Sequence, residues 1–213
     1  MKQRLFVTLS LAGLAMATFG ATKPKTAIKS LNKTTIQQPT YTEWHDLQVN
    51  AINRFPLHTN FFTYPADDWV YEKDGKIVSK DILHMNKAES KYFLSLDGTW
   101  KFNWVANADQ RPTDFYKEDL DDSKWKTMNL PGIWEMNGFG DPEYVNVGFG
   151  WRGHFDQQPP AVPTKDNHVG SYRRIIDIPA NWDGKQVVAH FGSVTSNIYL
   201  YVNGKFAGYA EDS

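Results

Sequence analysis

The stretch that decides the fold lies near the end of the chain, where residues 197–209 read NIYLYVNGKFAGY. Apolar aliphatic residues occupy every second position, at Ile198, Leu200 and Val202. This period of two is typical of a half-buried strand, with the intervening tyrosines on the opposite face. Asn203–Gly204 follows, and this dipeptide favours a two-residue hairpin because both turn residues need positive φ. The stretch therefore predicts an antiparallel hairpin.

Working outward, the same kind of pattern recurs along the second half of the chain. Alternating or apolar runs predict further strands at residues 99–104, 128–131, 172–178 and 187–191. Turn residues separate these runs, and no long segment carries a helical apolar stripe. Many short strands joined by frequent turns predict an all-β fold, an antiparallel β-sandwich of the jelly-roll type.

Composition narrows the function classes. The chain has 213 residues, with 23 basic against 24 acidic side chains and no cysteine. This near-neutral balance lacks the basic surface that nucleic-acid binders present to phosphates, so no nucleic-acid partner is expected. The absence of cysteine excludes disulfides, thiolate zinc sites and a cysteine nucleophile. The length suits one domain with an additional arm.

The first residues have the pattern of an export signal. Lys2 and Arg4 precede a mostly apolar run at residues 5–17, and small residues follow it. The alternative is a membrane anchor, but 13 residues at 1.5 Å each fall short of about 30 Å of hydrocarbon. Residues 1–21 are therefore predicted to be a signal peptide, and the protein to be periplasmic or secreted without a membrane partner.

The rest of the chain divides by composition into three further parts. Residues 22–40 are rich in Lys, Thr, Gln and Pro and predict a flexible leader. Residues 41–91 mix aromatic residues with Asn, Pro and Asp without periodicity and predict an irregular arm. Residues 92–213 hold the expected strands and form the predicted jelly-roll domain.

An ordered series of short motifs carries a family resemblance. They are Glu43-Trp44, Asn53-Arg54, SLDGTWKF at 95–102, PGIW at 131–134, YVNV at 144–147, VGSYR at 169–173 and YVNG with GYAEDS at 201–213. Together they resemble the amino-terminal region of bacterial β-galactosidases of glycoside hydrolase family 2. Single motifs such as an Asn-Gly turn are weak, but the ordered set is specific. Related β-glucuronidases and β-mannosidases share the fold, and YVNV points to the galactosidases.

The resemblance implies a sugar-binding jelly roll that precedes immunoglobulin-like domains and a catalytic (β/α)₈ barrel. Such enzymes hydrolyse terminal β-D-galactosides with retention, using two glutamates on the barrel. The sequence has no barrel-like alternation of strand and helix, so the chain alone is expected to be inactive and its jelly roll incomplete at the C-terminus. The expected partners are a β-galactoside and the remaining domains of a homo-oligomeric parent. The alternative is a freestanding, non-catalytic carbohydrate-binding module.

The resemblance also implies candidate site residues. Asn146 matches the family's asparagine that reaches the galactose pocket, and its alternative role is that of a turn residue bonded to its own backbone. Glu43, Asp46 and Glu211 match the surroundings of a structural magnesium, and their alternative is three solvated surface acids. The family's sodium site and its catalytic magnesium site are expected outside this chain, and no catalytic residue is expected within it.

Overall fold

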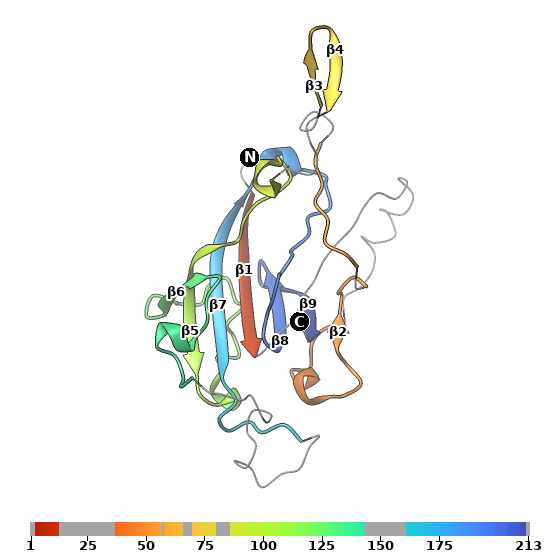
Figure 1. The fold of residues 1–213 in the computed structure, drawn as a ribbon. Helices are drawn as coiled ribbons and strands as arrows, with labels where there is room; N and C mark the ends of the chain where they lie inside the picture. The colour runs from red at the N-terminus through yellow and green to blue at the C-terminus, as the bar shows by residue number, and fades with distance from the viewer. Residues whose placement is uncertain are drawn as a thin grey trace.

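The computed structural model describes residues 3–12, 37–56, 58–65, 70–79, 86–142 and 161–211. Seven strands form one antiparallel sheet in the order β2-β9-β8-β1-β7-β5-β6 (Figure 1). Their bounds are β1 Gln3–Ala12, β2 Ala51–Ile52, β5 Gly98–Val105, β6 Lys126–Leu130, β7 Val169–Ile178, β8 Asn197–Val202 and β9 Lys205–Glu211. The predicted all-β class is confirmed, and the antiparallel sheet is consistent with a jelly roll.

The helical turns in the described part of the chain are short 3-10 segments. They are η1 Glu43–His45, η3 Lys87–Glu89, η4 Ala108–Gln110, η5 Glu135–Asn137 and η6 Ala180–Trp182. Among the described residues there is no apolar helix of a length that would cross a bilayer.

The hairpin predicted from residues 197–209 is present as β8 and β9. Asn203 and Gly204 take φ of 49° and 71°, the left-handed backbone that the Asn-Gly turn requires. The strands pair from Asn197 opposite Glu211 to Val202 opposite Lys205, with one irregularity between Leu200 and Tyr201. The sequence pattern is therefore confirmed at both the turn and the strands.

Alternation along the strands separates two hydrophobic clusters. The first cluster consists of Trp100, Phe102, Met128, Phe139, Tyr172, Ile176, Val194, Ile198 and Ala210. The second, called here the tyrosine cluster, consists of Phe115, Tyr199, Tyr201, Phe206 and Tyr209. Neighbouring positions on β8 and β9 thus contribute to different clusters, as the period of two requires. Partly buried arm residues, among them Tyr41, Trp44 and Ile52, pack on the tyrosine cluster.

The strand predicted at residues 187–191 is wrong. Residues 186–190 form no strand, and Val187 and Val188 are 47% and 38% exposed. An apolar run becomes a strand only where a neighbour offers free backbone groups. Here β7 already lies between β5 and β1, and β8 between β1 and β9, so neither flanking strand has an edge left to pair with.

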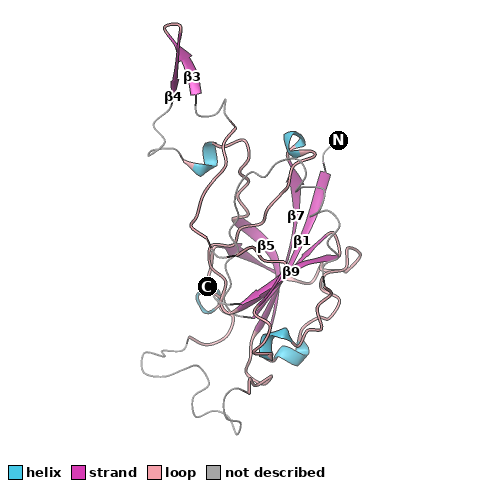
Figure 2. Ribbon diagram, turned by 90° about the vertical axis from the view of Figure 1, so that its right-hand side faces the viewer, coloured by secondary structure: helices cyan, strands magenta, loops and turns pink. Residues whose placement is uncertain are grey.

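The predicted arm, residues 41–91, contains η1, β2 and a separate hairpin of β3 Val70–Lys73 and β4 Lys76–Ser79. The hairpin strands pair only with each other and stand away from the main sheet in both views (Figures 1 and 2). Asp74 and Gly75 form its turn with positive φ, where the sequence predicted a turn within a solvated loop.

Strand β1 comes from the segment with the export pattern. It lies in the interior of the sheet, antiparallel to β7 on one side and to β8 on the other. This arrangement belongs to the uncut chain, whereas a signal peptide is removed during export. The signal peptide and the boundaries of the predicted leader and arm stay predictions.

Candidate functional site

The galactose-contacting candidate, Asn146, lies outside the described residues, as do its neighbours 143–160. Its role in a sugar pocket stays a prediction. The three acidic candidates, Glu43, Asp46 and Glu211, belong to the described residues. Glu43 and Glu211 lie where the arm meets the tyrosine cluster, and Asp46 directly follows η1.

Glu43, in η1, is the most buried of the three acids, at 3% exposure. Its Oε1 accepts hydrogen bonds from the Thr40 amide at 2.7 Å and the Thr40 hydroxyl at 2.9 Å, and its Oε2 accepts one from the Tyr199 hydroxyl at 2.9 Å. Burial acts to raise the pKa of Glu43, but these hydrogen bonds outweigh it and lower the pKa from its ordinary value. Glu43 is therefore an ionised, fully engaged carboxylate rather than a solvated surface acid.

Glu211, at the end of β9, is half-buried and, like Glu43, accepts a hydrogen bond from a tyrosine hydroxyl. The Tyr209 hydroxyl donates to its Oε1, and the Tyr199 and Tyr209 rings pack with centroids 4.6 Å apart. Burial raises the pKa of Tyr209, and the hydrogen bond to Glu211 raises it further. Burial and the hydrogen bond to Glu43 raise the pKa of Tyr199 in the same way. Both hydroxyls therefore stay protonated and act as donors.

Two further contacts hold the arm on the sheet. The hydroxyls of Tyr41 and Tyr201 share a hydrogen bond, and Arg54 Nη1 donates to the Glu211 carbonyl at 3.0 Å. Strand β2 adds two residue pairs along β9. The arm is thus joined to the tyrosine cluster by hydroxyl, carboxylate and backbone groups together.

Asp46 does not join this arrangement of carboxylates. It is exposed, and its Oδ1 accepts a hydrogen bond from the Gln48 amide at 2.9 Å in its own turn. Within the described residues, no three His, Cys, Asp or Glu side chains converge as a metal site. The structure brings Glu43 and Glu211 to one tyrosine pair, where tyrosine hydroxyls already occupy an oxygen of each. If magnesium bound there, the carboxylate oxygens would have to lose these hydrogen bonds or accept them while also coordinating the ion.

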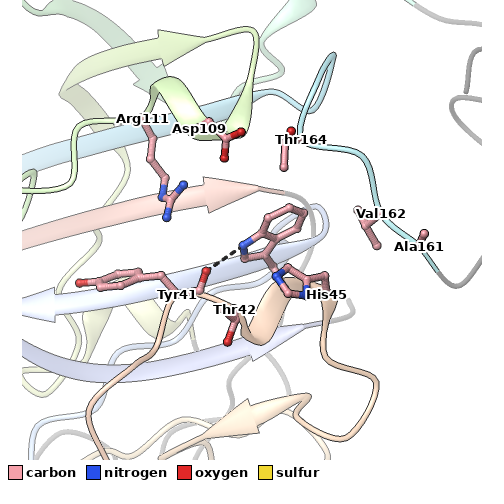
Figure 3. A pocket seen from close by; sticks show the side chains of 9 residues that line it. Tyr41, Thr42, His45, Asp109, Arg111, Ala161, Val162 and Thr164 are labelled. Carbon is pink, nitrogen blue, oxygen red and sulfur yellow. Dashed lines mark hydrogen bonds between the residues drawn. The ribbon is translucent and has the colours of Figure 1, made fainter. Parts of the chain in front are cut away.

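A pocket of about 450 Å³ opens beside η1, between the arm and two loops of the sheet. Its walls are Tyr41, Thr42, Trp44, His45, Asp109, Arg111, Ala161, Val162 and Thr164 (Figure 3). Arg111 lies over the Tyr41 ring at 5.9 Å and donates from Nη1 to the Ala108 carbonyl at 2.8 Å. Trp44 Nε1 donates to the Tyr41 carbonyl at 3.0 Å, so the indole is held in place.

The pocket combines apolar rings with polar side chains that can donate and accept. Trp44 packs its edge against His45 with centroids 4.7 Å apart, and the exposed carboxylate of Asp109 lines the same pocket. Pockets that fix small ligands commonly combine aromatic walls with a few placed polar groups. Sequence reasoning missed this pocket because its residues come from three separate segments and form no short motif.

The comparisons with known proteins agree with the fold. The family model described as "Glycosyl hydrolases family 2, sugar binding domain" matches residues 93–213. A β-galactosidase of Halalkalibacterium halodurans is 35% identical over 168 residues, which cover 79% of this chain and 15% of the relative. A β-galactosidase of Lactobacillus delbrueckii subsp. bulgaricus is 36% identical over 169 residues, with the same two shares.

A third relative is named as the large subunit of a β-galactosidase. The β-galactosidase large subunit of Lactobacillus helveticus is 35% identical over 180 residues, which cover 78% of this chain and 26% of the relative. The chain therefore spans only about 15 to 26% of the length of these relatives. In them the matched region is one part of a larger protein.

Proposed function

The chain belongs to family 2 of the glycosyl hydrolases through its sugar-binding domain, and from this premise we propose that it serves as the sugar-binding part of an exported β-galactosidase. The parent enzyme hydrolyses terminal β-D-galactosides with retention. The observation that carries the proposal is the match of residues 93–213 to the sugar-binding domain, with β-galactosidases as relatives.

Asn146 is the residue that we propose for sugar contact. A galactose presents hydroxyls that lose water on binding, and one amide side chain can both donate and accept towards them. The Asn146 position lies in a segment with Gly148 and Gly150, where the absence of a Cβ lets backbone approach a ligand closely.

The experiment measures kcat/KM of the intact parent enzyme carrying Asn146→Ala. Loss of a hydroxyl partner costs about 1–3 kcal/mol, which corresponds to a decrease of roughly 5- to 150-fold. Asn181→Ala is the matched control, because Asn181 is exposed in η6 and donates only a long hydrogen bond of 3.5 Å to the Lys91 carbonyl. An unchanged kcat/KM for Asn146→Ala would remove this residue from the pocket.

The isolated chain is proposed to supply a pocket residue and not to catalyse. Retaining hydrolysis needs two carboxyl groups about 5–5.5 Å apart, and the family places them on a barrel of roughly 250 residues. The purified chain should therefore release no chromophore from an aryl β-galactoside. Turnover that persists through repeated purification would contradict the assignment of catalysis to the remaining domains of the parent. We propose that this parent is a homo-oligomer.

The pocket beside η1 favours a second candidate, a freestanding carbohydrate-binding module. In that case the purified chain itself binds galactosides, with Trp44 and Tyr41 as walls and Arg111 as a donor. Calorimetric titration with lactose tests it, and Trp44→Ala should abolish the heat of binding. No binding at all would leave only the parent-enzyme proposal, whereas binding that survives Trp44→Ala would place the galactoside outside this pocket.

Export and magnesium binding complete the proposal. Sequencing the N-terminus of the protein recovered from the periplasm or medium should show a start near residue 18 or 22, and an intact Met1 would refute the signal peptide.

If Glu43, Asp46 and Glu211 bind magnesium, chelation should lower the melting temperature and added magnesium should restore it. Asp46→Asn should reduce this response, whereas Asp121→Asn, at an exposed turn, should leave it unchanged.

A further inference from the structure

The pocket beside η1 contains a positive charge that has no carboxylate partner within the described part of the chain. Arg111 directly follows η4, and its guanidinium carbon lies 5.9 Å from the centre of the Tyr41 ring. No described carboxylate oxygen comes within 4.0 Å of this guanidinium. Nη1 donates to the Ala108 carbonyl, whereas Nε and Nη2 donate to no described residue. These two donors can therefore serve a molecule that enters the pocket.

The guanidinium is held in place without a ligand. The Ala108 amide donates to the Thr164 carbonyl at 2.9 Å, which fixes η4 against the segment that follows residue 161. The contacts of Arg111 with the Ala108 carbonyl and the Tyr41 ring limit the rotation of its side chain. The N–H bonds of Nε and Nη2 run parallel, so the two groups can donate together to both oxygens of one carboxylate. A fork that is already ordered loses little conformational entropy on binding.

The other walls of the pocket suit a polyhydroxylated ring. Asp109 is exposed and forms no ion pair with Arg111, so its carboxylate can accept hydrogen bonds from hydroxyl groups. Figure 3 shows Arg111 and Asp109 on the side of the pocket opposite Tyr41 and Thr42. Trp44 already donates its Nε1 hydrogen to a backbone carbonyl, so its indole offers an apolar ring surface.

We propose that the pocket beside η1 binds a sugar acid, the uronic acid residue of a glycan. The carboxylate pairs with Nε and Nη2 of Arg111, the hydroxyls donate to Asp109, and one face of the sugar ring packs on Trp44. This inference deepens the second candidate function and rests on it only for a carbohydrate as the ligand. It depends neither on Asn146 nor on hydrolysis by the parent enzyme.

The preference for an acid over a neutral sugar follows from the strength of the hydrogen bonds. A neutral galactoside offers Arg111 only hydroxyl oxygens, whereas hydrogen bonds between a guanidinium and a carboxylate are about twice as strong as those between neutral groups. Two such bonds in parallel also fix the orientation of the sugar. The pocket should therefore favour a galacturonide over a galactoside of the same ring stereochemistry.

The experiment uses three probes that differ only at C6 of the sugar. Methyl β-D-galacturonide carries a carboxylate, its methyl ester is neutral, and methyl β-D-galactoside carries a hydroxymethyl group. Each is titrated into the full chain and followed by ligand-observed NMR. The galacturonide should bind roughly tenfold more tightly than either neutral probe. Acetate, a fourth probe, should bind more weakly than the galacturonide because it has neither hydroxyls for Asp109 nor a ring for Trp44.

Variants of the same chain assign the preference to one side chain. Arg111→Gln should equalise the affinities of the three sugar probes, because the charge is lost. Arg111→Lys should retain part of the preference, because it keeps the charge but lacks the parallel donors. Lys185→Gln is the matched control, since it removes a cation that lies over the Tyr92 ring at 4.9 Å, outside the lining of the pocket. It should leave the preference unchanged, and thermal melts check that each variant is folded.

The outcomes distinguish this inference from the proposed function. Equal binding of the galacturonide and its ester to the unaltered chain would overturn the sugar acid, and this comparison needs no variant. A preference that survives Arg111→Gln, or that Lys185→Gln removes, would also overturn it. Acetate that binds as tightly as the galacturonide would overturn the role of the sugar ring. The absence of binding by any probe would overturn both this inference and the second candidate function. The kcat/KM test of Asn146→Ala stands apart from all these results.

Discussion

At the scale of single residues, the carboxylate of Glu43 joins the irregular arm to the tyrosine cluster. Three donors from Thr40 and Tyr199 surround it at hydrogen-bonding distance, and almost none of its surface meets water. A buried charge with this many donors stabilises the fold only while it stays ionised. The docking of the arm therefore depends on pH.

Glu43→Gln should lower the free energy of unfolding at neutral pH by about 1–3 kcal/mol, because the charge-assisted hydrogen bonds are lost. The pKa of Glu43 is lowered in the folded state, so its contribution is complete above the unfolded value near 4.5 and is lost as the pH falls through the folded value. Urea unfolding at several pH values should show the wild type and Glu43→Gln converging in acid. A constant difference at all pH values would contradict this linkage.

A second residue-scale prediction concerns Gly170 on β7. A Cβ there would lie 2.6 Å from Trp134 Cζ2 and 2.8 Å from Phe102 Cε2. Gly170→Ala should therefore destabilise the protein by about 1–3 kcal/mol through overpacking. Gly192→Ala is the matched control, because its Cβ would meet nothing within 4 Å. Thermal melts that shift equally for both variants would argue against this contact.

The sequence predicted less at this scale than at any other. It treated Glu43 either as a metal ligand or as a solvated acid, and the structure shows a buried acceptor of tyrosine hydroxyls. Burial of a charged side chain depends on which distant segment covers it, and Tyr199 lies 156 positions away. No local pattern around residue 43 carries that information.

At the scale of elements, the β8–β9 hairpin is the best-determined unit. Alternating residues on both strands and an Asn-Gly turn all favour the same local structure. The run at residues 187–191 has similar apolar content and forms no strand, because pairing needs a partner that local sequence does not specify. Hairpins are therefore predictable here and isolated apolar runs are not.

Gly204→Val should destabilise the β8–β9 hairpin by about 1–2 kcal/mol, because a β-branched residue is strained at its φ of 71°. Asn203→Gly is the control, since glycine accepts the φ of 49° at that position without strain. Chemical denaturation of both variants measures the difference. A neutral Gly204→Val would indicate that the turn relaxes to another type.

At the scale of the whole molecule, the order of the strands in the sheet is a feature that the sequence did not predict. The strands succeed each other in space as β2-β9-β8-β1-β7-β5-β6, so the first and last described strands of the chain lie within one step of β8. Such pairings join residues that are about 190 positions apart. Strand patterns give the faces of each strand, whereas the order depends on how the whole chain closes.

Replacing residues 70–79 with a short Gly-Ser linker should leave the melting temperature of the main sheet unchanged. The β3–β4 hairpin pairs only within itself, and it shares no ladder with the other described strands. Replacing the edge strand β6, which contributes the buried Met128, should lower the melting temperature clearly. Circular dichroism melts of the two variants measure this contrast, and an equal loss would place the hairpin within the cooperative unit.

The separate position of the β3–β4 hairpin has a practical consequence. Its turn at Asp74–Gly75 stands away from the strands of the main sheet (Figures 1 and 2). An affinity tag inserted at that turn would tether the molecule to a sensor surface from one end. The pocket beside η1 would then remain open to analytes, and every immobilised copy would present it in the same orientation.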